Sequence, residues 1–192
     1  MIFPTSYFPS ILYFQYLLKN PIFSICENET YLKQSFRNRC EIMTSNGIQK
    51  LSIPVEKLNG SKSKTKEVII SNQQNWRKDH WRAIESAYKA SPFFQFYDKE
   101  VKDLIFSNSE NLISFNQKIL VQLISWWDLP VKQNNNDSSI YDKQIDFLSR
   151  TPVAPYTQVF HEKLPFVSNL SVLDLLFCEG PMGRKWFVDY PK

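Results

Sequence analysis

The chain has 192 residues, a formal net charge of +4, and 43% apolar and 15% aromatic residues. This length is typical of one domain with a sizeable core, so we expect a single domain over residues 1–192. The charge is far below that of proteins that neutralise many phosphates of a duplex, which makes nucleic acid an unlikely partner. Three widely spaced cysteines offer neither a disulfide framework nor a CxxC pair, and favour a reducing, cytoplasmic compartment.

The apolar N-terminal stretch, residues 1–18, raises the question of a signal peptide or a membrane span. It lacks a basic leading region, and Pro4 and Pro9 interrupt it before it reaches the roughly 20 apolar residues that a bilayer requires. We therefore expect it to belong to the fold, and we expect no membrane span. Pro9 predicts the start of a short helix that ends at Asn20-Pro21, and residues 22–26 predict a strand.

The middle of the chain carries the strongest hairpin signal. Two β-prone runs, 40–44 and 48–55, flank Asn46-Gly47, a step that favours a type I′ turn. Residues 58–66 alternate small polar residues with lysine and predict an exposed loop. Residues 66–71, centred on the apolar run 68–70, then predict a buried strand.

Two sequence pairs predict helix starts. Ser71 with Gln74, and Ser107 with Glu110, each match the capping box, in which two side chains satisfy free backbone N–H groups. The first helix is expected to run to about Ala90. The second has an apolar stripe at helical spacing and ends at Leu129-Pro130. For the aromatic run 93–97 the pattern favours no particular state.

The last third of the chain predicts a strand and a helix. Residues 132–143 are polar and rich in asparagine, as in either a lid or a surface insertion. Residues 156–160 predict a strand, and 171–179 a helix closed by Gly180 and Pro181. The expected fold is a mixed α/β (α+β) domain, with a short-stranded mixed sheet, an Asn-Gly hairpin and about four helices around it.

Several common chemical motifs are missing. The chain has no GxGxxG, GxxxxGK[ST], HExxH or Asp-x-Asp sequence, and only four glycines. Glycine-rich phosphate cradles and metal-dependent glycosyl transfer are therefore disfavoured. The two histidines, His80 and His161, are far from each other and from the cysteines, so we expect no metal site and no cofactor.

The segment from Lys33 to Arg39 is the sharpest local feature, because it holds three cations and two amides, including Gln34 and Asn38. If it is extended, Arg37 and Arg39 project from the same face and two guanidinium groups clamp a phosphate or carboxylate. The alternatives are a solvated strand face and buried pairing with Glu27, Glu29 or Glu41.

His80 lies between Trp76 and Trp81 and, with an ordinary pKa near 6.5, is the natural candidate for proton transfer. The alternative is a helix histidine that is hydrogen-bonded for packing. Tyr7 precedes Phe8-Pro9, and this rigid segment either shapes a pocket wall or packs in the core. The candidate catalytic residues are thus His80, Lys33 and Asn38, and the candidate substrate-binding residues are Arg37, Arg39, Gln34, Tyr7 and Trp81.

An ordered set of short motifs resembles the WbqC-like family. The motifs are Tyr7-Phe8-Pro9-Ser10, Lys33 to Arg39, Asn46-Gly47, Leu51 to Val55, Trp76 with His80-Trp81, Ser91 to Phe94 and Asn169 to Phe177. The resemblance implies a bacterial protein. Because members of the family are found among genes for O-antigen and other surface polysaccharides, it also implies a cytosolic step on a nucleotide sugar, amino sugar or carrier-bound intermediate.

Two hypotheses of function follow. The first is a metal-independent transferase that moves an acyl or aminoacyl group to a sugar amine. In it, Arg37 and Arg39 hold an anionic nucleotide sugar or acyl donor, His80 takes a proton, and Lys33 and Asn38 stabilise negative charge. The second is a non-catalytic binding or assembly protein of the same pathway. Convergence of His80 and the two arginines on one pocket favours the first hypothesis, and their separation favours the second.

A weaker third hypothesis is binding of single-stranded nucleic acid by stacking on Phe93, Phe94 and Phe96, which requires these rings to be exposed beside a basic groove. The sequence does not predict an oligomeric state.

Overall fold

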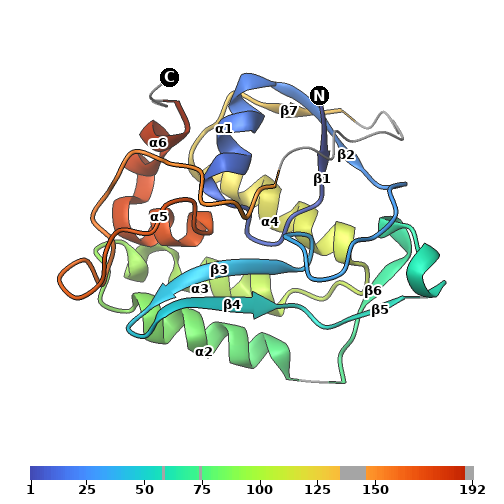
Figure 1. The fold of residues 1–192 in the computed structure, drawn as a ribbon, viewed down its shortest axis with the longest axis horizontal. Helices are drawn as coiled ribbons and strands as arrows, with labels where there is room; N and C mark the ends of the chain where they lie inside the picture. Colours follow the sequence, from blue (N-terminus) through green and yellow to red (C-terminus); the bar gives the residue numbers. More distant parts are fainter. Residues whose placement is uncertain (58, 74, 135–145, 189–192) are drawn as a thin grey trace.

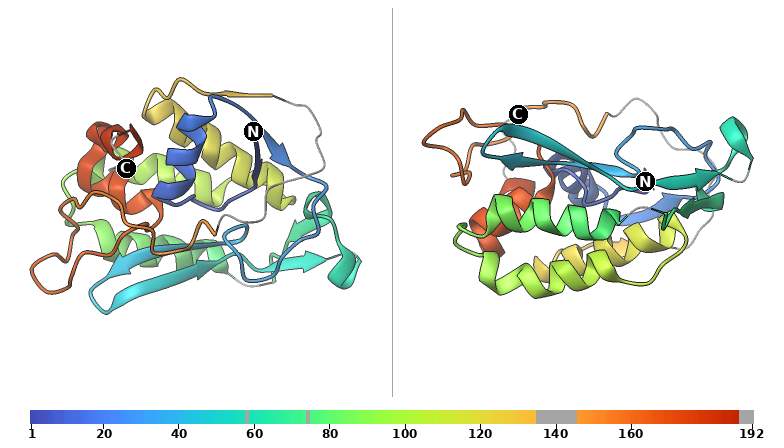
Figure 2. Two further views of the ribbon diagram at one scale, coloured as in Figure 1. Left: turned by 45° about the horizontal axis from the view of Figure 1, so that its top comes forward. Right: turned by 90° about the horizontal axis from the view of Figure 1, so that it is seen from below.

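The computed structural model describes residues 1–57, 59–73, 75–134 and 146–188. These residues form a mixed α/β fold in which small sheets lie on one side and most helices on the other (Figures 1 and 2). The expected fold class is therefore confirmed. The expected single sheet is replaced by three small ones, β1-β2-β7, β3-β4 and β5-β6, in the part of the chain that the structure describes.

A parallel sheet forms from segments far apart in the chain. Strands β1 (Ile2–Pro4), β2 (Ile22–Cys26) and β7 (Lys132–Gln133) pair in parallel, and helix α1 (Ile11–Lys19) connects the first two. The predicted first helix and its following strand are confirmed. Helix α1 packs with its apolar residues buried, which explains why an apolar N-terminus belongs to the core.

Strands β3 (Arg39–Thr44) and β4 (Gly47–Ser52) pair antiparallel, with Thr44 opposite Gly47. Ser45 and Asn46 form the turn, and neither has a positive φ, whereas Gly47 has φ +98°. A type I′ turn requires positive φ at both central residues, so the predicted turn type is wrong. The hairpin places Gly47 directly after the turn, where only glycine adopts such a backbone without strain.

The segment after β4 is more ordered than the sequence indicates. Strands β5 (Val55–Lys57) and β6 (Val68–Ile70) pair antiparallel, and two short 3-10 helices, η1 (Gly60–Lys62) and η2 (Thr65–Glu67), lie between them. Ser63 and Thr65 are fully buried, because Tyr31 N–H donates to the Ser63 carbonyl at 3.0 Å and Thr65 N–H donates to the Glu29 carbonyl at 2.9 Å. The predicted exposure is confirmed for Asn59, Gly60, Lys62, Lys64 and Lys66, but Ser63 and Thr65 are buried and the segment contains two short helices that the sequence did not predict.

Three helices, α2 (Trp76–Tyr88), α3 (Phe94–Phe106) and α4 (Leu112–Trp126), cover one side of the molecule (Figure 2). Neither Ser71 nor Ser107 is the residue before a helix start, since Asn75 precedes α2 and Asn111 precedes α4. The hydroxyl of Ser71 donates to Glu56 Oε1 at 2.7 Å, and Gln74 lies outside the described residues. Helix α4 is instead capped by Asn111, whose carboxamide oxygen accepts from the N–H groups of Ile113 and Ser114.

Helix α3 accounts for the aromatic run that carried no clear pattern. The run begins this helix, with Phe94 buried and Phe96 exposed to 60%. Ser107, predicted to open the next helix, instead follows the last turn of α3.

The C-terminal region contains helix α5 (Val172–Glu179), the 3-10 helix η3 (Gly180–Arg184) and the short helix α6 (Lys185–Val188). The predicted helix start at Ser171 and stop at Gly180 are confirmed. The predicted strand at 156–160 is wrong, because Tyr156 and Gln158 bond through their side chains to the buried Asp174. Most of the predicted lid or insertion at 132–143 lies outside the described residues; its first two residues form β7.

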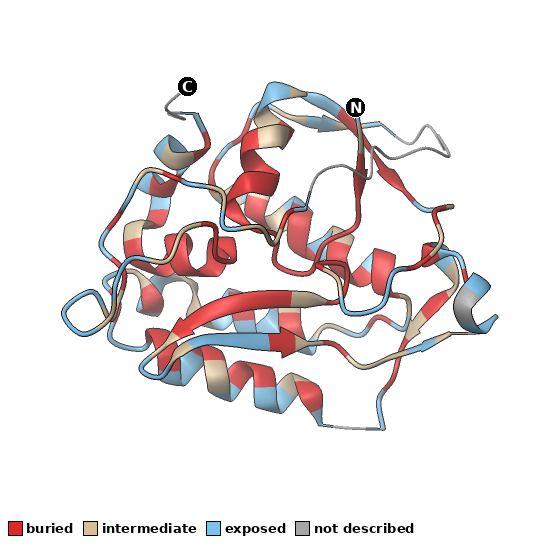
Figure 3. Ribbon diagram, in the orientation of Figure 1, coloured by how far each residue is buried: buried red, intermediate tan, exposed pale blue. Residues whose placement is uncertain are grey.

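Aromatic residues make up much of the buried core. Figure 3 shows that buried residues are concentrated on α1, α4, α5 and β3. Phe147, for example, contacts the rings of Phe3, Tyr13, Tyr16 and Phe36. The high aromatic content therefore serves packing, as large rigid rings do when they exclude water from a core. This packing fixes the loop that follows β2, where the candidate site lies.

Candidate functional site

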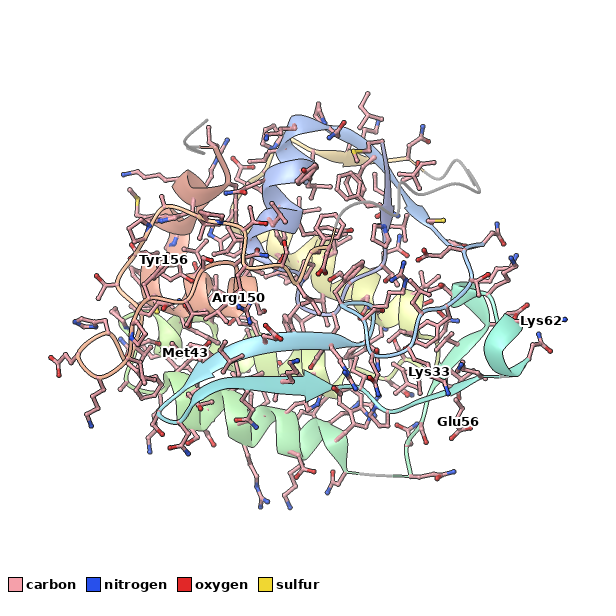
Figure 4. The ribbon with its side chains drawn as sticks, in the orientation of Figure 1. Lys33, Met43, Glu56, Lys62, Arg150 and Tyr156 are labelled. Atoms are coloured by element: carbon pink, nitrogen blue, oxygen red, sulfur yellow. The ribbon has the colours of Figure 1, made fainter. Side chains whose placement is uncertain are left out.

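A cleft of about 610 Å³ opens at the end of β4, between the loop that carries Lys33 and strand β5. Figure 4 marks its position with Lys33 and the neighbouring Glu56. The cleft is lined by Tyr31, Lys33, Gln34, Asn38, Arg39, Ser52, Ile53, Pro54, Val55, Lys57 and Gly60. Four of the predicted site residues, Lys33, Gln34, Asn38 and Arg39, thus come together here.

The cleft is basic. It is lined by Lys33, Arg39 and Lys57, and by no aspartate or glutamate among the residues that the structure describes. Partial desolvation lowers the pKa of Lys57, and the neighbouring charge of Lys33 lowers it further. Burial raises the pKa of Tyr31 to about 12, despite the opposing effect of Arg37 and Arg39, so its hydroxyl stays protonated at neutral pH. The cleft therefore offers positive charge and a neutral O–H donor.

The walls of the cleft also hold polar atoms without partners. Tyr31 Oη, Asn38 Oδ1 and Arg39 Nε are buried and have no hydrogen-bond partner within the described ranges. Buried polar atoms in native proteins are nearly always paired, and exceptions call for a water, an ion or a ligand. Asn38 is fixed from both sides, since its Nδ2 donates to the Ile53 carbonyl and Ile53 N–H donates back to the Asn38 carbonyl, each at 2.8 Å.

The backbone at Gln34 is strained. Its φ of +56° lies in the left-handed region, which residues other than glycine seldom adopt. Such strain clusters at binding and active sites, where the surrounding structure holds it. The exposed Gln34 side chain therefore belongs to a segment whose shape is imposed by the fold around it.

Arg37 does not reach the cleft. Residues 33–38 form turns and β3 begins only at Arg39, so the prediction that both arginines leave one face of an extended strand is wrong. The Arg37 side chain is 1% exposed, and its Nε and Nη2 donate to the two carboxylate oxygens of Glu29 at 2.7 and 2.5 Å. Of the open alternatives, the buried pairing with Glu29 is the one that the structure contains.

His80, Tyr7 and Trp81 also lie outside the cleft lining. His80 Nδ1 is 2.9 Å from the hydroxyl of the fully buried Tyr7. Burial lowers the pKa of His80 to about 4, against the smaller opposing effect of its hydrogen bond to the Ser52 backbone. The ring is therefore neutral at pH 7. His80 lies beside the backbone of Ser52, which forms part of the cleft wall.

The remaining candidate residues lie in the packed core, outside the cleft lining. The ring of Trp81 stacks on Phe94 at 6.1 Å, and both residues are buried. Because Phe94 is buried, the three phenylalanines proposed as a nucleic-acid platform do not share one exposed face. Cys40 is buried too, and burial raises the pKa of its thiol.

Sequence reasoning missed Tyr31, Lys57 and the wall formed by residues 52–55. Lys57 and Tyr31 are remote in sequence from each other, and the cation lies 5.8 Å from the centre of the tyrosine ring. The motif Leu51 to Val55 was a visible signal, but it carries no charged residue and so pointed to no chemistry. Its role as a wall of the cleft becomes clear only from the structure, in which Asn38 Nδ2 donates to the Ile53 carbonyl.

Within the described residues, no helix is long and apolar enough to cross a membrane. In the same part of the chain no group of three or more His, Cys, Asp or Glu residues is arranged to hold a metal ion.

The fold and the site define a mixed α/β protein with a basic cleft at the end of a hairpin. A model of the WbqC-like protein family matches residues 5–144, and the chain belongs to this family. The motif at 169–177 lies beyond the matched region. An uncharacterized protein of Mycobacterium tuberculosis is 29% identical over 136 residues, which is 70% of this chain and 58% of that relative's length. No solved structure matches the chain.

Proposed function

We propose that the protein binds a small anionic substrate in the basic cleft, as one step of surface-polysaccharide biosynthesis in the bacterial cytosol. The observation that carries the proposal is the convergence of Lys33, Arg39 and Lys57 on one cleft whose described lining has no acidic residue. These three cations form no salt bridge with the carboxylates that the structure describes, which favours an anionic ligand, and the guanidinium fork suits phosphate and carboxylate groups. The pathway rests on the family resemblance.

The reaction we propose is metal-independent acyl or aminoacyl transfer to a sugar amine, with a nucleotide sugar or an acyl donor as the anionic ligand. Lys33 and Arg39 hold its charge, and Tyr31 donates a hydrogen bond. Asn38 and Gln34 shape the cleft, and Asn38 Oδ1 accepts from the ligand. Arg37 acts at a distance, since its pairing with Glu29 supports the loop that carries Lys33.

The experiment is a titration of the protein with inorganic pyrophosphate, nucleotide sugars and acyl-CoA species by calorimetry. We expect Lys33→Ala and Arg39→Ala each to weaken binding about tenfold or more, the loss expected for one charge-assisted contact. Lys99→Ala and Arg82→Ala serve as matched controls, because both residues are exposed and outside the cleft. Binding that is equally weakened in all four variants, or absent in the wild type, contradicts the proposal.

The position of His80 favours a second candidate, a non-catalytic binding protein of the same pathway. His80 is buried, neutral and hydrogen-bonded to the buried Tyr7, and in the part of the chain that the structure describes no histidine lines the cleft to transfer a proton. Incubation with a bound donor and amino sugars, followed by mass spectrometry, separates the two. A product supports the transferase, and a ligand recovered unchanged supports the binding protein.

A further inference from the structure

An enclosed crevice adjoins the basic cleft, and Arg39 lines both. The crevice has a volume of about 10 Å³ and is bordered by Tyr7 and Ser10 of the N-terminal segment, by Glu41 of β3 and by Ser171 before α5. This space holds at most a single water molecule. It nevertheless gathers residues of several motifs that the cleft itself does not use.

Glu41 is the only carboxylate that borders the crevice in the described part of the chain, and its side chain is 7% exposed. Two cations neutralise it. Lys50 lies opposite on β4 with its Nζ 3.6 Å from Oε1, and Arg150 contacts Oε2 from the loop after residue 146. Their side chains are 63% and 39% exposed. A buried carboxylate needs a cationic partner, because an unpaired buried charge is costly. A partly exposed cation contributes little stability to such a pair, so the cation of a ligand can replace it at small cost.

Arg39 and Glu41 are two residues apart on β3, so their side chains leave the strand on the same face, with Cα atoms roughly 7 Å apart. The cation that belongs to the cleft thus stands beside the carboxylate that belongs to the crevice. A ligand with an anionic group and a protonated amine a few bonds apart matches this pair of charges.

We infer that Glu41 binds the ammonium group of an amino-sugar acceptor, which takes the place of Arg150. The inference rests on the proposed function, because the acceptor must lie beside an anion held at Arg39. Only the side chain of Arg150 has to leave. The backbone before it is held by Asn169, whose Nδ2 donates to the carbonyls of Phe147 at 3.1 Å and Ser149 at 2.6 Å. Figure 4 shows Arg150 beside β3.

The test compares glucosamine 1-phosphate with glucose 1-phosphate, which differ only in an ammonium against a hydroxyl group. We expect the wild type to bind the amino sugar about tenfold more tightly, the size of one charge-assisted hydrogen bond. Glu41→Gln should remove this preference and leave the affinity for glucose 1-phosphate unchanged. Arg150→Ala should increase the preference, because the competing cation is gone. If Glu41→Gln does not fold, Arg150→Ala alone decides, since it keeps Glu41.

Two outcomes separate this inference from the proposed function. If glucose 1-phosphate binds through Arg39, but wild type and Arg150→Ala show no preference for the amino sugar, the role of Glu41 is overturned and the anion site stands. If neither sugar phosphate nor pyrophosphate binds, the proposed function fails. Glucosamine and glucose, titrated into Arg150→Ala, then test Glu41 without any phosphate: a preference for glucosamine supports it, and equal binding overturns it.

Discussion

Arg37 and Arg39 are separated by one residue, yet they have different environments. The guanidinium of Arg37 is fully buried and paired with Glu29, whereas Arg39 is half-buried at the cleft. A buried ion pair contributes little net stability compared with an apolar pair, but removal of one partner leaves the other charge unpaired. The two arginines should therefore differ in how their loss affects folding and binding.

Replacement of Arg37 by alanine should lower the free energy of unfolding by about 3–5 kcal/mol, because the buried Glu29 loses its only salt-bridge partner in the described structure. Arg39→Ala should change it by less than about 1 kcal/mol, as is usual for residues near the surface. Urea denaturation monitored by circular dichroism measures both. Equal losses for the two variants contradict the separation of structural and binding roles.

His80 gives a pH dependence of stability. Its pKa is about 4 in the folded protein and about 6.5 in the unfolded chain. Between these values the unfolded chain binds more protons, so the free energy of unfolding is at its full value above pH 6.5 and decreases as the pH falls towards 4. This difference between the two pKa values corresponds to at most about 3–4 kcal/mol.

Urea midpoints measured between pH 4 and 7 check this expectation. His80→Gln should flatten the dependence of stability on pH in this window. His161→Gln should keep the wild-type dependence, because it leaves His80 buried. Wild-type and His80→Gln curves of equal slope from pH 6.5 to 4 would mean that the pKa of His80 is not lowered in the folded protein. That result would restore it as a candidate for proton transfer.

At the scale of elements, two glycines with positive φ lie at the ends of helices. Gly180 follows α5 with φ +55°, and a Cβ there would lie 2.4 Å from the Phe93 ring. Gly60 begins η1 with φ +57°, and a Cβ there meets nothing within 4 Å. Gly60→Ala therefore introduces only the strain of a positive φ, whereas Gly180→Ala introduces a positive φ and a clash with the Phe93 ring.

We expect Gly60→Ala to lower the free energy of unfolding by about 1 kcal/mol, as a left-handed residue does. Gly180→Ala should lower it by about 2–4 kcal/mol, because overpacking adds to the strain. Thermal and urea unfolding of both variants measure the difference. If Gly180→Ala is no worse than Gly60→Ala, then Phe93 moves without cost and does not fix the end of α5.

Elements marked by local sequence patterns were predictable, including α4 and strand β2, whereas the two 3-10 helices between β5 and β6 were not. The stripe of α4 and the stop at Gly180 are local signals, and both appear in the structure. The order of residues 59–67 depends on bonds to Glu29 and Tyr31, about 35 residues away, as β-type pairing often does. The same limit applies to the site. The basic run from Lys33 to Arg39 is visible in the sequence, but only the folded loop shows that Arg37 pairs with Glu29 and does not line the cleft.

At the scale of the whole molecule, the aromatic core and the basic cleft depend on different forces. Core packing is apolar and insensitive to salt screening, whereas the attraction of an anion to partly exposed cations falls with ionic strength. Lys33, Arg39 and Lys57 come from a loop, β3 and β5. Ligand binding and folding should therefore respond to salt in different ways.

An increase in sodium chloride from 0.05 to 0.5 M should weaken pyrophosphate binding by about tenfold, because the Debye length falls from roughly 14 Å to 4 Å. The free energy of unfolding should change by less than about 1 kcal/mol, since the buried Arg37–Glu29 pair is poorly screened. Lys33→Ala/Lys57→Ala should reduce the dependence of binding on salt, and Lys99→Ala should leave it unchanged. Binding that does not vary with salt would show that hydrogen bonds of Tyr31 and Asn38, rather than the three cations, hold the ligand.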